Sequence, residues 1–171
     1  MRSHVRLGNS GLIGGVLFMT GLLITSTPRV HAAGPYDTFT VSPCRVLDTR
    51  ISSPVGPIPA NGTRNILVAG SLAGSGQGGA SDCGVPDPGA TGVFINVVAV
   101  NAAGPGHLTV YPFGSSLPLA STLNFTTGQT IANGVLVPIC TPSASCTLDL
   151  SITMGPSGAH VVIDVTGYLA P

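Results

Sequence analysis

Apolar and polar residues alternate with a period of two through most of this chain, and that period is typical of β-strands. Residues 146–154 show it most clearly: the apolar positions are Leu148, Leu150, Ile152 and Met154, and the polar ones are Thr147, Asp149, Ser151 and Thr153. Successive side chains of a strand point to opposite faces, so this pattern predicts a strand with one buried face. Residues 92–101 are apolar at nearly every position, which predicts a strand in the middle of a sheet or between two layers.

Segments of this kind recur along the chain and are separated by turn-forming residues such as Gly104-Pro105-Gly106. About nine strands are expected, at residues 38–41, 45–48, 64–69, 92–101, 107–111, 121–125, 130–137, 146–154 and 160–168. Beyond residue 32, no long stretch keeps apolar residues at helical spacing. Many short strands with Gly and Pro turns predict an all-β fold, an antiparallel β-sandwich of the jelly-roll or immunoglobulin-like type.

The first 32 residues have the pattern of an export signal. Arg2 and Arg6 precede an apolar run at residues 11–25, and Val30-His31-Ala32 offers small residues at the spacing that a signal peptidase requires. A run of about 15 residues is shorter than the roughly 20 that a membrane-spanning helix needs. We therefore expect a signal peptide at residues 1–32 and a single secreted domain at residues 33–171, with no membrane span in the mature chain.

The charged residues are few and of only two kinds. All six basic residues are Arg and all six acidic residues are Asp, so the chain has neither Lys nor Glu. Only Arg45, Arg50 and Arg64 would remain after cleavage. A nucleic-acid-binding domain needs clustered cations, so this composition argues against nucleic acid as a partner. With 43% hydrophobic and 7% charged residues, the chain also lacks the composition of a disordered protein.

Four cysteines follow the predicted cleavage site, and export favours disulfides, for which three connectivities are possible. Cys140 and Cys146 flank a turn-forming pentapeptide between two apolar runs, so a bridge between them needs the least ordering. Cys44 would then pair with Cys83. A metal site is the rival interpretation, but neither pair has Cys-x2-Cys spacing and no His lies close by. The Gly-rich residues 70–79 fall inside the larger loop and are expected to form a flexible surface loop within one domain.

Four charged residues form the best candidate for a special site. Asp48 and Arg50 are two apart on a segment expected to be extended, so they would share a face, and Asp164 lies in an otherwise apolar strand. A partly buried carboxylate needs a cationic partner. We expect an ion pair of Arg45 or Arg50 with Asp164 or Asp48, which would fix the first strand against the last. The functional alternative is a ligand site, in which an Arg fork binds a carboxylate or phosphate.

Signals for catalysis and metal binding are weak. His107 and His160 each begin a predicted strand, but no Gly-x-Ser-x-Gly elbow or similar nucleophile motif accompanies them. Asp82 and Asp87 could offer oxygens to calcium, but the chain has no Asp-x-Asp-x-Asp loop, so a turn is the simpler interpretation. We therefore expect a protein that is not an enzyme, with no catalytic residue, cofactor or metal site.

Sugar-binding sandwiches usually stack sugars on exposed aromatic rings, and this chain has no Trp. Tyr36, Tyr111 and Tyr168 could form a small platform of this kind. Packing of the rings, with each hydroxyl at the surface, is the structural alternative.

An ordered set of motifs resembles a family of secreted bacterial modules. The motifs are Pro-Cys-Arg-Val-Leu-Asp-Thr-Arg at 43–50, Cys-Gly-Val-Pro at 83–86, His-Leu-Thr-Val-Tyr-Pro at 107–112, Ser-Thr-Leu-Asn-Phe at 121–125 and Asp-Val-Thr-Gly-Tyr at 164–168. In the family, a Pro-Cys-Arg-x-x-Asp-Thr-Arg start and an Asp-Val-x-Gly-Tyr end frame a β-rich unit of similar length. The resemblance implies export, a bacterial source, a β fold and the cysteine pairing above, and it implies no reaction. Leu169 departs from the Phe common at that position.

Three functions remain open on these grounds. The first is a non-catalytic secreted module with a structural or adhesive role at the cell surface or in the extracellular matrix, where weakly charged strands would pair edge to edge with further copies. The second is a module that binds polysaccharide or cell-wall glycan. The third is a secreted hydrolase.

Overall fold

The computed structural model describes residues 35–140 and 146–171, within the compact unit Ala33–Pro171. The predicted signal peptide at residues 1–32 lies outside the described residues. Within them the regular secondary structure is entirely β, and no helix is long and apolar enough to cross a membrane. The strands are β1 (Asp37–Asp48), β2 (Thr63–Ile66), β3 (Gly92–Val100), β4 (Gly106–Pro112), β5 (Leu123–Phe125), β6 (Ile131–Pro138), β7 (Leu150–Met154) and β8 (His160–Ala170).

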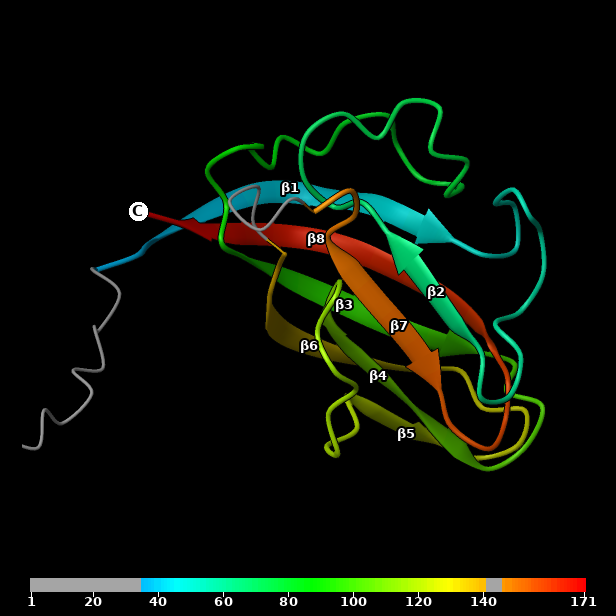
Figure 1. Cartoon of the computed structure of the whole chain (residues 1–171). Helices are drawn as coiled ribbons and strands as arrows, with labels where there is room; N and C mark the ends of the chain where they lie inside the picture. The colour runs from blue at the N-terminus through cyan, green and yellow to red at the C-terminus, as the bar shows by residue number, and fades with distance from the viewer. Residues whose placement is uncertain (1–34, 141–145) are drawn as a thin grey trace, which may run out of the picture. The chain divides into compact units, whose positions relative to one another are not determined.

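The strands form two antiparallel sheets of four, in the orders β1-β8-β3-β6 and β2-β7-β4-β5 (Figure 1). Pairing is nested along the chain: β1 pairs with β8, β2 with β7, β3 with β6, and β4 with β5. Two further pairings, β3 with β8 and β4 with β7, complete the sheets. The first strand is therefore paired with the last, and strands distant in sequence lie side by side.

One hydrophobic core joins the two sheets. Alternate residues of β3 are fully or almost fully buried, and so are the apolar residues of β7. The core residues contributed by these two strands are Val93, Ile95, Val97, Ala99, Leu150, Ile152 and Met154. Since one continuous cluster draws on both sheets, the inner faces pack against each other, which accounts for the two-residue alternation in the sequence. The all-β prediction is confirmed.

The expected count of about nine strands is wrong by one. Residues 38–41 and 45–48 belong to one strand, β1, which continues through Ser42 and Pro43. The register with β8 shifts between Thr40 and Cys44, and again between Arg45 and Leu47. Because β1 lies at a sheet edge and is irregular here, a residue without an N–H is tolerated, and the Ser-Pro dipeptide interrupts the ladder without ending the strand.

The polar face predicted for residues 146–154 is partly buried. Strand β7 begins at Leu150, and Asp149 and Ser151 are buried. β7 lies in the interior of its sheet, with one edge paired to β2 and the other to β4. Asp149 is kept there by hydrogen bonds, because its Oδ2 accepts from the backbone N–H groups of Val68 (2.6 Å) and Ala69 (2.9 Å). These bonds also end β2 earlier than the predicted residue 69.

The Gly-rich segment at residues 70–79 is docked on β1 rather than free at the surface. The N–H of Asp48 donates to the carbonyl of Gln77 (2.9 Å), and the N–H of Ala80 donates to that of Arg45 (2.8 Å). A Cβ at Gly79 would collide with the backbone of Arg45 and Val46, so only glycine allows this approach. The connection between β2 and β3 thus covers the outer edge of the second half of β1, and Figure 1 shows it arching over that strand.

Both expected disulfides are present. Cys44 is bonded to Cys83, with 5.6 Å between their Cα atoms, and Cys140 is bonded to Cys146. The turn expected at residues 141–145 lies outside the described residues. The first bridge fixes the docked segment to β1, and the second closes a short loop before β7.

The two bridges should differ in their effect on stability. Closing a loop of about 40 residues removes roughly 4 kcal/mol of unfolded-chain entropy, whereas a loop of about 7 residues removes roughly 2 kcal/mol. We expect the double variant Cys44→Ala/Cys83→Ala to lose more unfolding free energy than Cys140→Ala/Cys146→Ala. Guanidinium unfolding of both variants checks the order. A larger loss for the second variant would contradict it.

Candidate functional site

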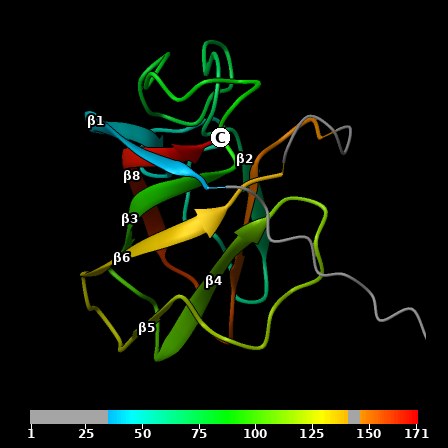
Figure 2. The same ribbon diagram turned by 90° about the vertical axis from the view of Figure 1, so that its left-hand side faces the viewer.

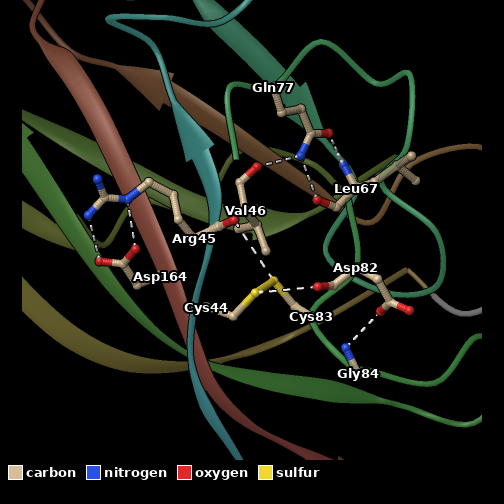
Figure 3. The surroundings of a disulfide bond; sticks show 9 residues. All are labelled: Cys44, Arg45, Val46, Leu67, Gln77, Asp82, Cys83, Gly84 and Asp164. Carbon is tan, nitrogen blue, oxygen red and sulfur yellow. Dashed lines mark hydrogen bonds and ion pairs between the residues drawn. A yellow bond between two sulfur atoms is a disulfide. The ribbon is translucent and has the colours of Figure 1, made fainter. Parts of the chain in front are cut away.

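The structure brings all four predicted charged residues into one chain of ion pairs. The Arg45 guanidinium donates to Asp164 (Nε to Oδ1, 2.9 Å) and lies 3.4 Å from Asp48 (Nη1 to Oδ2). Arg50 donates to Asp48 through Nε (2.8 Å) and Nη2 (2.6 Å). Arg45 and Asp164 are direct cross-strand partners on β1 and β8, and Figure 3 shows their side chains meeting. The network therefore joins the first strand to the last.

The geometry around Asp48 differs from the extended segment expected there. β1 ends at Asp48, and the chain turns immediately afterwards. Oδ1 of Asp48 accepts the backbone N–H of Arg50 (3.0 Å), while its carbonyl accepts the N–H of Ile51 and Ser52. Asp48 and Arg50 meet because the carboxylate holds this turn, not because they share a strand face. The Arg50 guanidinium, helped by its N–H, holds the pKa of the 3%-exposed Asp48 below its usual range.

This arrangement favours the structural role of the charged cluster. Nε and Nη2 of Arg50 are both directed to Asp48, and all three guanidinium nitrogens of Arg45 contact Asp48 or Asp164. The hydrogen bond to Asp164 raises the pKa of Arg45, and that to Asp48 raises the pKa of Arg50. An incoming carboxylate or phosphate would have to displace these partners.

His160 and His107 each lie against residues that have a structural role. Nδ1 of His160 lies 3.1 Å from Oγ1 of Thr49, and that oxygen also accepts the N–H of Val161 (2.9 Å). Thr49 is fully buried, so its hydroxyl cannot reach a substrate. The ring of His107 lies against Gly155, where a side chain would collide with it. Among the described residues, no hydrogen bond joins either histidine to an accessible hydroxyl or thiol.

Two buried polar residues were missed in the sequence. Asp149 has its pKa raised by burial, against the opposing effect of its two backbone hydrogen bonds. Gln77 accepts the N–H of Leu67 at Oε1 (2.7 Å), and its Nε2 donates to the carbonyls of Leu67 and Val46 (2.9 Å each; Figure 3). Both side chains form hydrogen bonds with backbone groups that are not paired between strands. Asp149 is the only charged residue in the segment 146–154, which was the available signal for it, whereas Gln77 stands in a Gly/Ser-rich run that gave none.

The three tyrosines are placed too differently to form one platform. Tyr111 is buried, with its hydroxyl 2.9 Å from Oγ1 of Thr153. Tyr36 is exposed near the start of β1, and Tyr168 stacks on Phe39 with ring centroids 5.0 Å apart and planes 14° from parallel. The aromatic pair that the surface presents is therefore Phe39 and Tyr168, which occupy opposite positions on β1 and β8.

No group of three potential ligands among His, Cys, Asp and Glu lies together in the described parts of the chain. Asp82, considered above for calcium, instead accepts the N–H of Gly84 (2.8 Å) through Oδ1 and so stabilises a turn.

A groove of about 400 Å³ runs between β6, at the end of one sheet, and β4 of the other. Figure 2 shows these two strands beside each other. Its lining has no charged residue and consists of Thr109, Val110, Tyr111, Pro112, Pro118, Ala120, Ser121, Thr122, Asn133, Val135, Leu136, Val137 and Pro138. Such a surface suits an uncharged partner.

Comparisons with protein-family models, curated proteins and solved structures found no match to this chain.

The buried carboxylate of Asp48 should make stability depend on pH. Its lowered native pKa means that its contribution is present above the ordinary value near 3.8 and is lost as pH falls through the native pKa. We expect Asp48→Asn to cost about 1–2 kcal/mol at pH 7, since both arginine partners are partly exposed. The difference from the natural protein should shrink below pH 4. Urea unfolding from pH 7 to 2.5, with the exposed Asp37→Asn as control, checks this; a constant difference would contradict it.

Proposed function

We propose that this protein is a secreted, non-catalytic module that serves a structural or adhesive role by joining other chains at a sheet edge. We also propose that its sandwich is of the jelly-roll type. The nested pairing of first with last strand, with two sheets of four, supports the jelly-roll alternative over the immunoglobulin-like one. The two disulfides are consistent with a location outside the cytoplasm.

The observation that carries this proposal is the unequal protection of the four sheet edges. The edges are formed by β1, β6, β2 and β5. β1 has register shifts and a proline, and its second half is covered by the docked loop. β2 has four residues and β5 has three, so each offers little edge for pairing.

Most of β6 lacks these protective features. It has eight residues, carries no charge and pairs with β3 without a register shift, and its only proline is the last residue. In the described part of the chain, no strand or bridge pairs with its other edge. Natural proteins usually block long, regular edges with charges, prolines or bulges. An edge left open in this way favours a role in strand addition.

Glycan binding is the second candidate, and one observation favours it. The stacked Phe39 and Tyr168 form an aromatic surface, and Phe39 is 40% exposed. Aromatic rings of this kind can bind the apolar face of a sugar. The site is small, however, since the exposed Tyr36 and the buried Tyr111 are not part of the pair.

The two candidates make opposite predictions for the purified mature domain. Strand addition predicts oligomers whose mass increases with protein concentration, measured by light scattering after size-exclusion chromatography. Phe39→Ala should leave that assembly unchanged, because Phe39 is distant from β6 in the sheet order.

Glycan binding predicts instead a monomer that is retained on insoluble cell-wall glycan and released by Phe39→Ala. A monomer at every concentration that also fails to adhere to cell walls or matrix would overturn the proposed structural role. The Thr38→Ala variant, altered at a neighbouring exposed position, is the matched control for Phe39→Ala.

A further inference from the structure

The hydrogen-bonding pattern of β6 shows which of its residues face the open edge. Ile139, directly after β6, donates its N–H to the carbonyl of Thr91 (3.1 Å), next to β3. The register continues without a shift through the opposite pairs of β3 and β6, so odd-numbered residues of β6 bond β3. The even-numbered residues Ala132, Gly134 and Leu136 therefore direct their N–H and C=O groups outward. Pro138, which has no N–H, also falls on an outward position.

The groove beside this edge fits the side chains of an added strand. Core-facing Val135 and Val137 of β6 form one wall, and residues of β4 and of the segment before β5 form the other. A strand added to β6 would place every second side chain in this uncharged groove. The occupant should therefore be an extended segment whose groove-facing side chains are uncharged and small or medium in size.

We propose that the occupant is β6 of a second copy, paired antiparallel about a two-fold axis at Gly134. This inference rests on the structural role proposed above and names its partner and register. Outward backbone groups must face each other, so Gly134 pairs with its own equivalent and Ala132 pairs with Leu136 of the partner copy. The result is a continuous eight-stranded sheet through two domains.

The residues of β6 are complementary to themselves in this register. Gly134 is exposed and a Cβ there would meet nothing within 4 Å, so no described side chain lies over the strand at the centre of the pairing. Leu136, which is 47% exposed, would pack beside the small Ala132 of the partner copy. Neither β6 nor the groove carries a charge, so no like charges meet when a strand is brought against its own copy.

A cysteine cross-link tests both partner and register. Directly opposite residues that exchange hydrogen bonds have Cα atoms about 5.5 Å apart, within the range for a disulfide. Gly134→Cys should therefore form a covalent dimer under mild oxidation, seen on a non-reducing gel and reversed by reductant. Ala132→Cys is the matched control on the same strand, because the two copies of residue 132 would be about 14 Å apart. All four native cysteines are bonded, so each variant has a single free thiol.

A second pair of variants tests the hydrogen bonds themselves. Gly134→Pro removes the outward N–H without removing a bond to β3, and it should weaken the dimer at least tenfold. Gly134→Ala retains the N–H and should dimerise more strongly than Gly134→Pro. The melting temperature of each variant, measured below the assembly concentration, separates lost pairing from lost folding.

The outcomes separate this inference from the proposed function. A natural protein that assembles while Gly134→Cys fails to cross-link, or cross-links no better than Ala132→Cys, overturns the β6 pairing and leaves a structural role standing. Unchanged assembly of Gly134→Pro also overturns it. A natural protein that neither assembles nor adheres overturns both.

Discussion

Each β-sheet ends in two strands whose outer N–H and C=O groups have no partner within that sheet, and the treatment of these groups explains much of this structure. A two-sheet domain has four such edges. Here the chain covers one half of β1, keeps β2 and β5 short and leaves β6 regular and uncharged. Backbone groups without partners tend to pair with other strands. The arrangement of edges is therefore the physical basis of the proposed function.

The covered edge at β1 also explains why several unusual residues lie together. The Cys44–Cys83 bridge and the side chain of Gln77 fix the Gly-rich segment to β1, while Arg45 binds Asp164 across the β1–β8 pair. One side of β1 is thus sealed by a loop, and the pairing on its other side is reinforced by an ion pair (Figure 3). The charged cluster, for which the sequence predicted an ion pair, reinforces the pairing of β1 with β8.

The sequence was sufficient for features that depend on local pattern. Alternation located most strands, and the cysteine spacing gave both disulfides. The sequence was insufficient for features that depend on how distant segments come together. The continuity of β1 through Pro43 depends on its being an edge strand, and the roles of Gln77 and Asp149 depend on backbone groups left unpaired by distant segments. The open edge of β6 follows from strand order, which no local pattern contains.

Amide hydrogen exchange of β6 tests the central claim most directly. On raising the concentration of the domain at residues 33–171, the account predicts that the amides of Ala132, Gly134 and Leu136 become protected, while those of the covered half of β1 keep the protection they already have. Exchange at those three amides that stays fast in the assembled protein, or protection that appears instead at another sheet edge, would contradict it.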